Sequence, residues 1–255
     1  MRIGVIGTGG IGAALTYKLG TTGHTVRVAN TRGPSRLTAL AERSGATPVT
    51  LDSVSRDVDV LITSIPLGRL PDLRPLTDRL PAGVVVADTS NYLPQRDGRI
   101  KDIEDGMPQG LWIEQQLGRP VIRAWNALVQ TTLSDKGRPP GAADRLAVPV
   151  AGTDPAAKKL VMTLVDDTGF DPVDAGTAED GWRMQPGTPA YCTDLTAAQL
   201  QKALALAHHE TARVRREAIL AIMSSWERND SFFDDLVALN RATAGLHRLA
   251  GDPGS

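Results

Sequence analysis

A glycine-rich segment near the start of the chain has the residue types and spacing of a phosphate-binding loop. It reads Gly7-Thr8-Gly9-Gly10-Ile11-Gly12, directly after the apolar run Arg2–Ile6 and before a segment of helical character. In this context Gly7 allows a tight turn, Gly9 lets backbone approach a pyrophosphate, and Gly12 lets helix and strand pack closely. The N–H groups at the helix start would then face the phosphates. The pattern predicts a dinucleotide site, with a glycine-rich turn of another α/β protein as the alternative.

The residues after the second β-rich run, Thr25–Ala29, indicate which dinucleotide is bound. A carboxylate at this point would bind the ribose hydroxyls of NAD, but the chain reads Asn30-Thr31-Arg32-Gly33-Pro34-Ser35-Arg36. A guanidinium group matches a phosphate through two parallel hydrogen bonds. We therefore expect a 2′-phosphate site, and NADP rather than NAD, at Thr31, Arg32, Ser35 and Arg36. The alternative is that these residues are solvated and surround the start of the next helix.

Further polar side chains follow the later apolar runs. Ligands bind at the carboxyl ends of the strands in open parallel sheets, so Ser64-Ile65-Pro66 is predicted to line the path of the ribose and nicotinamide. Asn91 and Asn126 also follow such runs. Their amides both donate and accept, which suits a carboxamide or a substrate carbonyl. Each could instead be a turn residue that satisfies local backbone.

A proline-broken segment, residues 182–192, contains two aromatic residues, an arginine, an amide and the only thiol. Long irregular segments often carry function, and this one could close over the nicotinamide. Tyr191 could donate a proton to a reduced carbonyl. The alternative is a rigid strap packed on the core, with Cys192 as an inert buried thiol.

A metal site at His208-His209-Glu210 is disfavoured, because neighbouring side chains on a helix point about 100° apart and the two imidazoles cannot easily face one ion. We expect no metal site. The predicted catalytic candidates are Tyr191 and Asn126. The predicted cofactor-binding residues are Gly7, Thr8, Gly9, Gly10, Ile11, Gly12, Asn30, Thr31, Arg32, Ser35, Arg36, Ser64, Ile65, Pro66, Asn91 and Asn126.

The elements that would position these residues follow from hydrophobic patterning. Apolar runs at residues 57–66, 83–91, 121–126 and 146–152 are continuous rather than alternating, as in strands covered on both faces. Helical stretches separate them, which predicts an α/β Rossmann fold with a doubly wound, mostly parallel sheet. We divide the chain into an NADP-binding domain, residues 1–176, and a helical C-terminal region for substrate binding and dimerisation, residues 177–255.

Helix signals refine this division. Asp154-Pro155 predicts the start of a helix that runs through residue 168, and Thr196–Gln199 has a capping-box pattern. One long periodic segment, Leu200–Trp226, is expected to be helical and either bend or pack on a second copy of itself. A further helix is expected over Phe232–Leu249, and the tail from residue 251 is expected to be disordered.

Composition limits the partners. The 255 residues carry a formal net charge of −1, which argues against nucleic acid or a membrane surface as the partner. Without a membrane-length apolar run or a leader before the first strand, and with one cysteine, the chain is expected to be cytoplasmic. A small-molecule substrate is the expected partner.

The chain resembles the deazaflavin-dependent NADP oxidoreductases, also called NADPH-dependent coenzyme F-420 reductases. The matching pieces are the segment from Ile6 to Gly12, Asn30-Thr31-Arg32, Ser64-Ile65-Pro66, and Ala124-Trp125-Asn126-Ala127-Leu128, which resembles the family's Lys-Ala-Phe-Asn-Thr pattern. The resemblance covers most of residues 1–175. It implies direct hydride transfer between stacked nicotinamide and deazaflavin rings, and a homodimer formed through the C-terminal helices.

The sequence departs from that family in two places. Residues 92–119 look like an insertion, and the helical C-terminal part looks longer than in compact members. Both changes fall where the second substrate should bind. Two other functions therefore remain as alternatives to hydride transfer between NADPH and a deazaflavin. One is an NADPH-dependent reductase of a small carbonyl or imine, with Tyr191 or a water as proton donor; the other is a non-catalytic module that senses NADPH.

Overall fold

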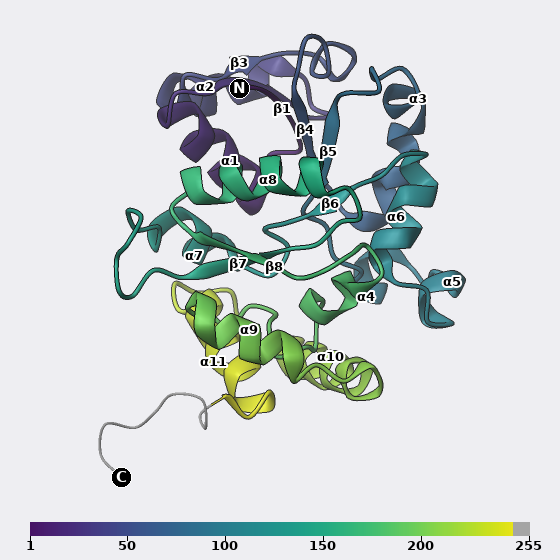
Figure 1. The fold of residues 1–255 in the computed structure, drawn as a ribbon, viewed down its shortest axis with the longest axis vertical. Coiled ribbons are helices and arrows are strands. Elements are labelled where there is room, and N and C mark those ends of the chain that lie inside the picture. Colours follow the sequence, from purple (N-terminus) through teal and green to yellow (C-terminus); the bar gives the residue numbers. More distant parts are fainter. Residues whose placement is uncertain (247–255) are drawn as a thin grey trace.

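The computed structural model describes residues 1–246 and contains a parallel six-stranded sheet (Figure 1). The strand order is β3-β2-β1-β4-β5-β6, so β2 and β3 extend the sheet to one side of β1, and β4, β5 and β6 extend it to the other side. This arrangement confirms the predicted Rossmann-type fold. The strands are β1 (Arg2–Ile6), β2 (Thr25–Ala29), β3 (Thr47–Pro48), β4 (Val60–Thr63), β5 (Val85–Asp88) and β6 (Ile122–Arg123).

Helices cover both faces of the sheet, as its continuous apolar strands require. On one face α1, α2, α7 and α8 pack on the side chains of Ile3, Val5 and Ile62. On the other face η3, α3 and α6 pack on Ile6, Leu61 and Val86. These elements are α1 (Gly10–Thr21), α2 (Thr38–Ser44), the 3₁₀ helix η3 (Leu67–Leu73), α3 (Arg74–Thr77), α6 (Gln109–Leu117), α7 (Gln130–Asp135) and α8 (Pro155–Asp167). Asp154 caps α8 as predicted, accepting from Ala156 N at 2.8 Å.

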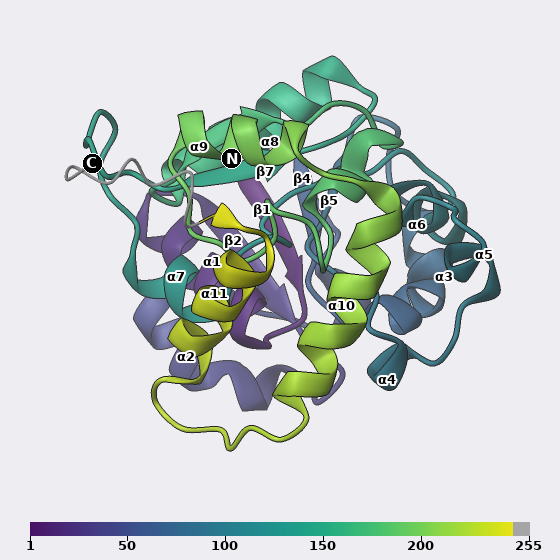
Figure 2. The same ribbon diagram turned by 90° about the horizontal axis from the view of Figure 1, so that it is seen from below.

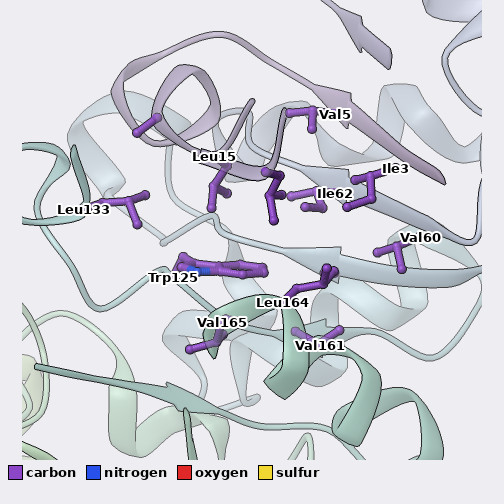
Figure 3. Packing of buried hydrophobic residues seen from close by; sticks show 14 of the residues in the cluster. Ile3, Val5, Leu15, Val60, Ile62, Trp125, Leu133, Val161, Leu164 and Val165 are labelled. Atoms are coloured by element: carbon purple, nitrogen blue, oxygen red, sulfur yellow. The ribbon is translucent and has the colours of Figure 1, made fainter. Parts of the chain in front are cut away.

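Trp125, just after β6, lies at the centre of the first of these cores. Figure 3 shows its ring between strand residues such as Ile62 and the α8 residues Leu164 and Val165. The side chain is fully buried, and its Nε1 donates to Thr168 Oγ1 at 3.2 Å. Its backbone has φ +56°, a left-handed conformation that is rare outside glycine. Core packing thus holds the turn that carries Asn126.

The prediction for residues 146–152 was right for the strand and wrong for its sheet. β7 (Ala147–Val150) pairs in parallel with β8 (Asp171–Asp174) in a separate two-stranded sheet. One antiparallel bridge between Arg123 and Ala151 connects it to the end of the main sheet. β6 is only two residues long, so it offers little edge for another strand. An apolar run predicts a buried strand but does not specify its partner.

Up to residue 246, the C-terminal region contains the α-helices α9 (Ala197–Ala205), α10 (His209–Met223) and α11 (Phe232–Thr243), which lie together in Figure 1. The expected capping box starts α9, with Thr196 N donating to Gln199 Oε1 at 3.1 Å. The long periodic segment is not one helix, because His208 is extended (φ −124°, ψ 125°). α11 ends at Thr243; the rest of its predicted span reaches past residue 246, and residues 247–249 and the predicted tail lie outside the described residues.

The remaining short elements lie mainly in loops: η1 (Pro34–Leu37), η2 (Leu51–Ser53), η4 (Asp180–Met184), α4 (Pro94–Asp97) and α5 (Lys101–Glu104). α4, α5 and α6 all lie within the segment of residues 92–119. No helix among residues 1–246 is long and apolar enough to cross a membrane.

Candidate active site

The glycine-rich loop joins β1 to α1 in a conformation that its glycines require. Gly7 has φ +101°, and a Cβ there would lie 2.2 Å from the carbonyl oxygen of Ser64. A Cβ on Gly12 would lie 2.1 Å from the carbonyl oxygen of Gly7. Gly9, the residue before the first turn of α1, is different, because nothing lies within 4 Å of where its Cβ would be. The absence of a side chain at Gly7 and Gly12 therefore allows neighbouring backbone segments to pack closely. Gly9 instead leaves the backbone open at the helix N-terminus, as a phosphate site needs.

One cavity begins at this loop and extends across the end of β2. Asn30 joins the two loops there: its Nδ2 donates to Thr8 Oγ1 at 3.0 Å, and its Oδ1 accepts from Arg32 N at 2.9 Å. The cavity is lined by nine of the predicted residues, namely Gly7, Thr8, Gly9, Asn30, Thr31, Arg32, Ser64, Ile65 and Pro66. It therefore brings the loop and the predicted 2′-phosphate residues together.

Two of the predicted 2′-phosphate residues lie elsewhere. Ser35 and Arg36 are exposed on η1 and are not among the residues that line this cavity. Arg69 and Asp72 of η3 line it instead, with Arg69 Nη2 2.7 Å from Asp72 Oδ2. Nothing in the sequence marked Arg69, because its position depends on how η3 packs on the far side of β4.

A second cavity continues from the same loop toward the end of β6. Gly9, Ser64, Ile65 and Pro66 line both cavities, so the two form one groove along the carboxyl ends of the strands. Of the predicted residues, this end of the groove is lined by Gly9, Gly10, Ile11, Ser64, Ile65, Pro66, Asn91, Asn126 and Tyr191. Gly12 is buried beneath the loop and lines neither part among the described residues.

Asn91 and Asn126 hold one another at this end of the groove. Asn91 Nδ2 donates to the carbonyl oxygen of Asn126 at 2.8 Å, and Asn126 Nδ2 donates to Asn91 Oδ1 at 3.1 Å. Asn126 Nδ2 also donates to the carbonyl oxygen of Met184 at 2.8 Å. Asn126 is 2% exposed, and its Oδ1 accepts no hydrogen bond from residues 1–246. A buried acceptor without a donor is costly, so this oxygen is suited to an N–H group of a ligand.

A buried ion pair holds the ends of the two strands that lead to these asparagines. Arg123 Nη1 lies 3.0 Å from Asp88 Oδ1, with both side chains almost fully buried. Thr63 Oγ1 donates to the other carboxylate oxygen at 2.6 Å, and Ser90 Oγ donates to Oδ1 at 2.7 Å. Burial lowers the pKa of Arg123, and the nearby Asp88 carboxylate opposes that shift. The network fixes the ends of β5 and β6, from which Asn91 and Asn126 project.

The strap of residues 182–192 closes the same end of the groove. Met184 contacts Asn126 as described, and Cys192 N donates to the carbonyl oxygen of Ala127 at 2.8 Å. Burial raises the pKa of the Tyr191 phenol well above its usual value, so that the phenol stays protonated at neutral pH. Burial also raises the pKa of the Cys192 thiol. Tyr191 thus keeps its proton and could give it only to a strongly basic atom such as a developing alkoxide, whereas Cys192 is poorly suited to be a nucleophile.

Several lining residues were not predicted. Gln130 of α7 lies against Gly10, Arg96 of α4 donates to the carbonyl oxygen of Asn91 at 2.6 Å, and Phe233 and Leu236 of α11 cover the groove. They come from helices far along the chain. Only the placement of Arg96 in a segment flagged as an insertion near the second substrate gave a signal in the sequence.

The residues present fit a dinucleotide. The open backbone at Gly9 suits the pyrophosphate, Arg32 is available for a 2′-phosphate, and the orphan acceptor of Asn126 suits a carboxamide N–H. A metal has no comparable site within residues 1–246, where no cluster of three or more His, Cys, Asp or Glu side chains occurs.

Comparisons with known proteins agree with this geometry. The family described as NADP oxidoreductase, coenzyme F420-dependent, matches residues 2–92. The Escherichia coli (strain K12) protein YjhV is 42% identical over 104 residues, which cover 41% of this chain and 75% of that protein.

Two solved structures are also similar. The Sinorhizobium meliloti protein SMa0349 has a TM-score of 0.66 at 26% identity, over 77% of this chain and 95% of that one. A candidate F420-dependent NADP-reductase from Arthrobacter sp. FB24 has a TM-score of 0.55 at 26% identity, over 70% of this chain and 86% of that one. The chain belongs to the family of NADP oxidoreductases described as coenzyme F420-dependent.

Proposed function

We propose that the protein binds NADPH along the groove and passes its hydride to a second substrate at the Asn126 end. The observation that carries the proposal is the continuity of the groove, which runs from Arg32 past Gly9 to Asn126 and Tyr191. NADPH would supply the hydride. The chain's own groups supply binding and orientation: the first N–H groups of α1 for the pyrophosphate, Arg32 for the 2′-phosphate, and Asn126 Oδ1 for the carboxamide.

The second substrate would lie against Tyr191, Phe233 and Leu236, which line the nicotinamide end of the groove. These side chains exclude water from the reacting atoms, and the asparagine pair limits how the carboxamide can turn. Hydride transfer between two stacked rings depends on such positioning more than on an acid or base. The family match and the Arthrobacter structure support a deazaflavin as that substrate.

Mixing the protein with NADPH and the oxidised deazaflavin, and following the absorbance of both, tests this assignment. Rapid loss of both absorbances is expected. If NADPH binds tightly but neither absorbance changes, the deazaflavin is wrong as substrate. If no carbonyl, imine or deazaflavin acceptor oxidises the bound NADPH, the protein is a nucleotide-binding sensor.

The second candidate function is reduction of a small carbonyl or imine, favoured by the protonated phenol of Tyr191 in the groove. Its hydroxyl would give the product its proton. Tyr191→Phe should then lower kcat by about 100-fold or more, whereas hydride transfer to a deazaflavin should hardly change. Equal NADPH affinity of the variant and the wild type is the control that the groove is intact.

A further inference from the structure

A third cavity lies apart from the cofactor groove, beside α10, which crosses the face shown in Figure 2. Its walls come from the connection between α5 and α6, from η4 and the residues just after it, and from the first half of α10. None of its lining residues among those described also lines the groove. Binding the dinucleotide therefore does not account for it.

Arg216 of α10 faces this cavity with hydrogen-bonding capacity that the protein does not use. Its side chain is only 10% exposed, and its Nε makes no hydrogen bond with any part of residues 1–246. Its Nη2 lies 3.7 Å from Glu104 Oε1, beyond hydrogen-bonding distance, and its guanidinium carbon lies 5.4 Å from the centre of the Tyr92 ring. A buried cation with so few partners is costly unless an anion completes its contacts.

Glu104 is the nearest anion, but it satisfies Arg216 only in part, because Nη2 stays 3.7 Å from Glu104 Oε1 and Nε has no hydrogen-bond partner within residues 1–246. Glu104 Oε1 already accepts from the Tyr92 hydroxyl at 2.8 Å. Gln109, which is 2% exposed, accepts from Tyr92 N at 3.1 Å through its Oε1. That bond leaves the amide nitrogen of Gln109 as a second donor on the cavity wall. The cavity thus joins a buried cation to a buried amide donor.

The charges and apolar surfaces of the cavity narrow the class of ligand. The rings of Trp182 and His209 both line the cavity, with their centres 5.1 Å apart and their planes tilted by 59°, so that Trp182 alone offers a flat apolar face. The titratable residues around the cavity include two arginines, Arg213 and Arg216, and three acids, Glu104, Asp105 and Glu210. The three acids would repel a highly charged anion. We propose that this cavity binds a small monocarboxylate with a flat apolar part, its carboxylate on Arg216 and its flat part on Trp182.

This cavity and the groove share one segment of chain. Trp182 and Gln185 line the cavity, while the carbonyl oxygen of Met184, between them, accepts from Asn126. A ligand bound at Trp182 therefore rests on the same strap that holds Asn126 in the reaction groove.

The proposal is tested on the full chain without nucleotide, so its result is independent of the oxidoreductase activity. Benzoate serves as the probe, and the indole N–H signal of Trp182 in ¹H–¹⁵N spectra is the readout. Saturable shifts with benzoate and none with the neutral isostere benzamide are expected. No benzoate shift, or equal shifts with benzamide, would overturn the proposal. Tighter binding of inorganic phosphate than of benzoate would also contradict it.

Variants locate the anion contact. Arg216→Gln should weaken benzoate binding by about tenfold or more, because a charge-assisted hydrogen bond is lost. Arg215→Gln, on the same helix but outside the cavity, should bind as the wild type does. If Arg216→Gln unfolds, Arg213→Glu at the exposed rim provides the test, since it places a negative charge near the carboxylate. Undiminished benzoate affinity in both cavity variants would exclude this site.

Discussion

At the scale of single residues, Arg32 gives the sharpest test of cofactor choice. Its side chain lines the end of the groove beyond Gly9, where a 2′-phosphate would lie. Arg32→Ala should weaken NADPH binding by about tenfold or more and leave NADH binding nearly unchanged, because only NADPH carries the phosphate. Calorimetric titration of both nucleotides measures this, with Arg43→Ala, an exposed residue of α2, as control. Equal weakening of both nucleotides would mean that Arg32 does not contact the phosphate.

Asn126 should be sensitive to a change of one atom. In Asn126→Asp a carboxylate oxygen replaces the Nδ2 that donates to Met184 O and Asn91 Oδ1, so acceptors face each other. The free energy of unfolding should fall by about 1–3 kcal/mol, with a loss of kcat.

Asn91→Asp is the matched control for that change, because it removes only the bond from Asn91 Nδ2 to the carbonyl oxygen of Asn126. Denaturant unfolding and steady-state rates of the two variants measure the difference. A smaller effect at Asn126 than at Asn91 would show that Asn126 is not the central residue of the pair.

At the scale of the elements, two glycines of the loop between β1 and α1 are expected to differ in role, one serving folding and the other serving NADPH binding. Gly12→Ala would put a Cβ 2.1 Å from the carbonyl oxygen of Gly7, so stability should fall. Gly9→Ala has open space for its Cβ, so its melting temperature should stay close to that of the wild type while NADPH binding is lost. Thermal unfolding and nucleotide titration of both variants separate the two effects. A Gly9→Ala protein that binds NADPH normally would place the pyrophosphate elsewhere.

The same elements show how far sequence reasoning could reach. The glycine spacing, the apolar strands and the caps at Asp154 and Thr196 are local signals, and the structure confirms the elements they predicted. The sheet that receives β7 and the break at His208 depend on contacts between distant segments. For the same reason Gln130 and Phe233 were missed in the groove, since their helices reach it only through tertiary packing.

At the scale of the whole molecule, the C-terminal helices are expected to form a homodimer. Within residues 1–246, Ile219 is the only buried residue of α10, while Val214 is 63% and Ile222 is 42% exposed. A second copy packed on this face would cover both side chains. Light scattering at micromolar concentration should give twice the chain mass for the wild type and for Glu217→Gln. Val214→Glu should be monomeric, because it buries a charge in the interface; a monomeric wild type would contradict the dimer.

The proposed function depends on one path for the cofactor, from Arg32 to Asn126. The most direct measurement is a crystal structure of the protein with NADP⁺. We predict the 2′-phosphate at Arg32, the pyrophosphate at Gly9 and the first turn of α1, and the carboxamide within hydrogen-bonding distance of Asn126 Oδ1. A nicotinamide lying away from Asn126 and Tyr191, or a dinucleotide outside the groove, would contradict the proposed function.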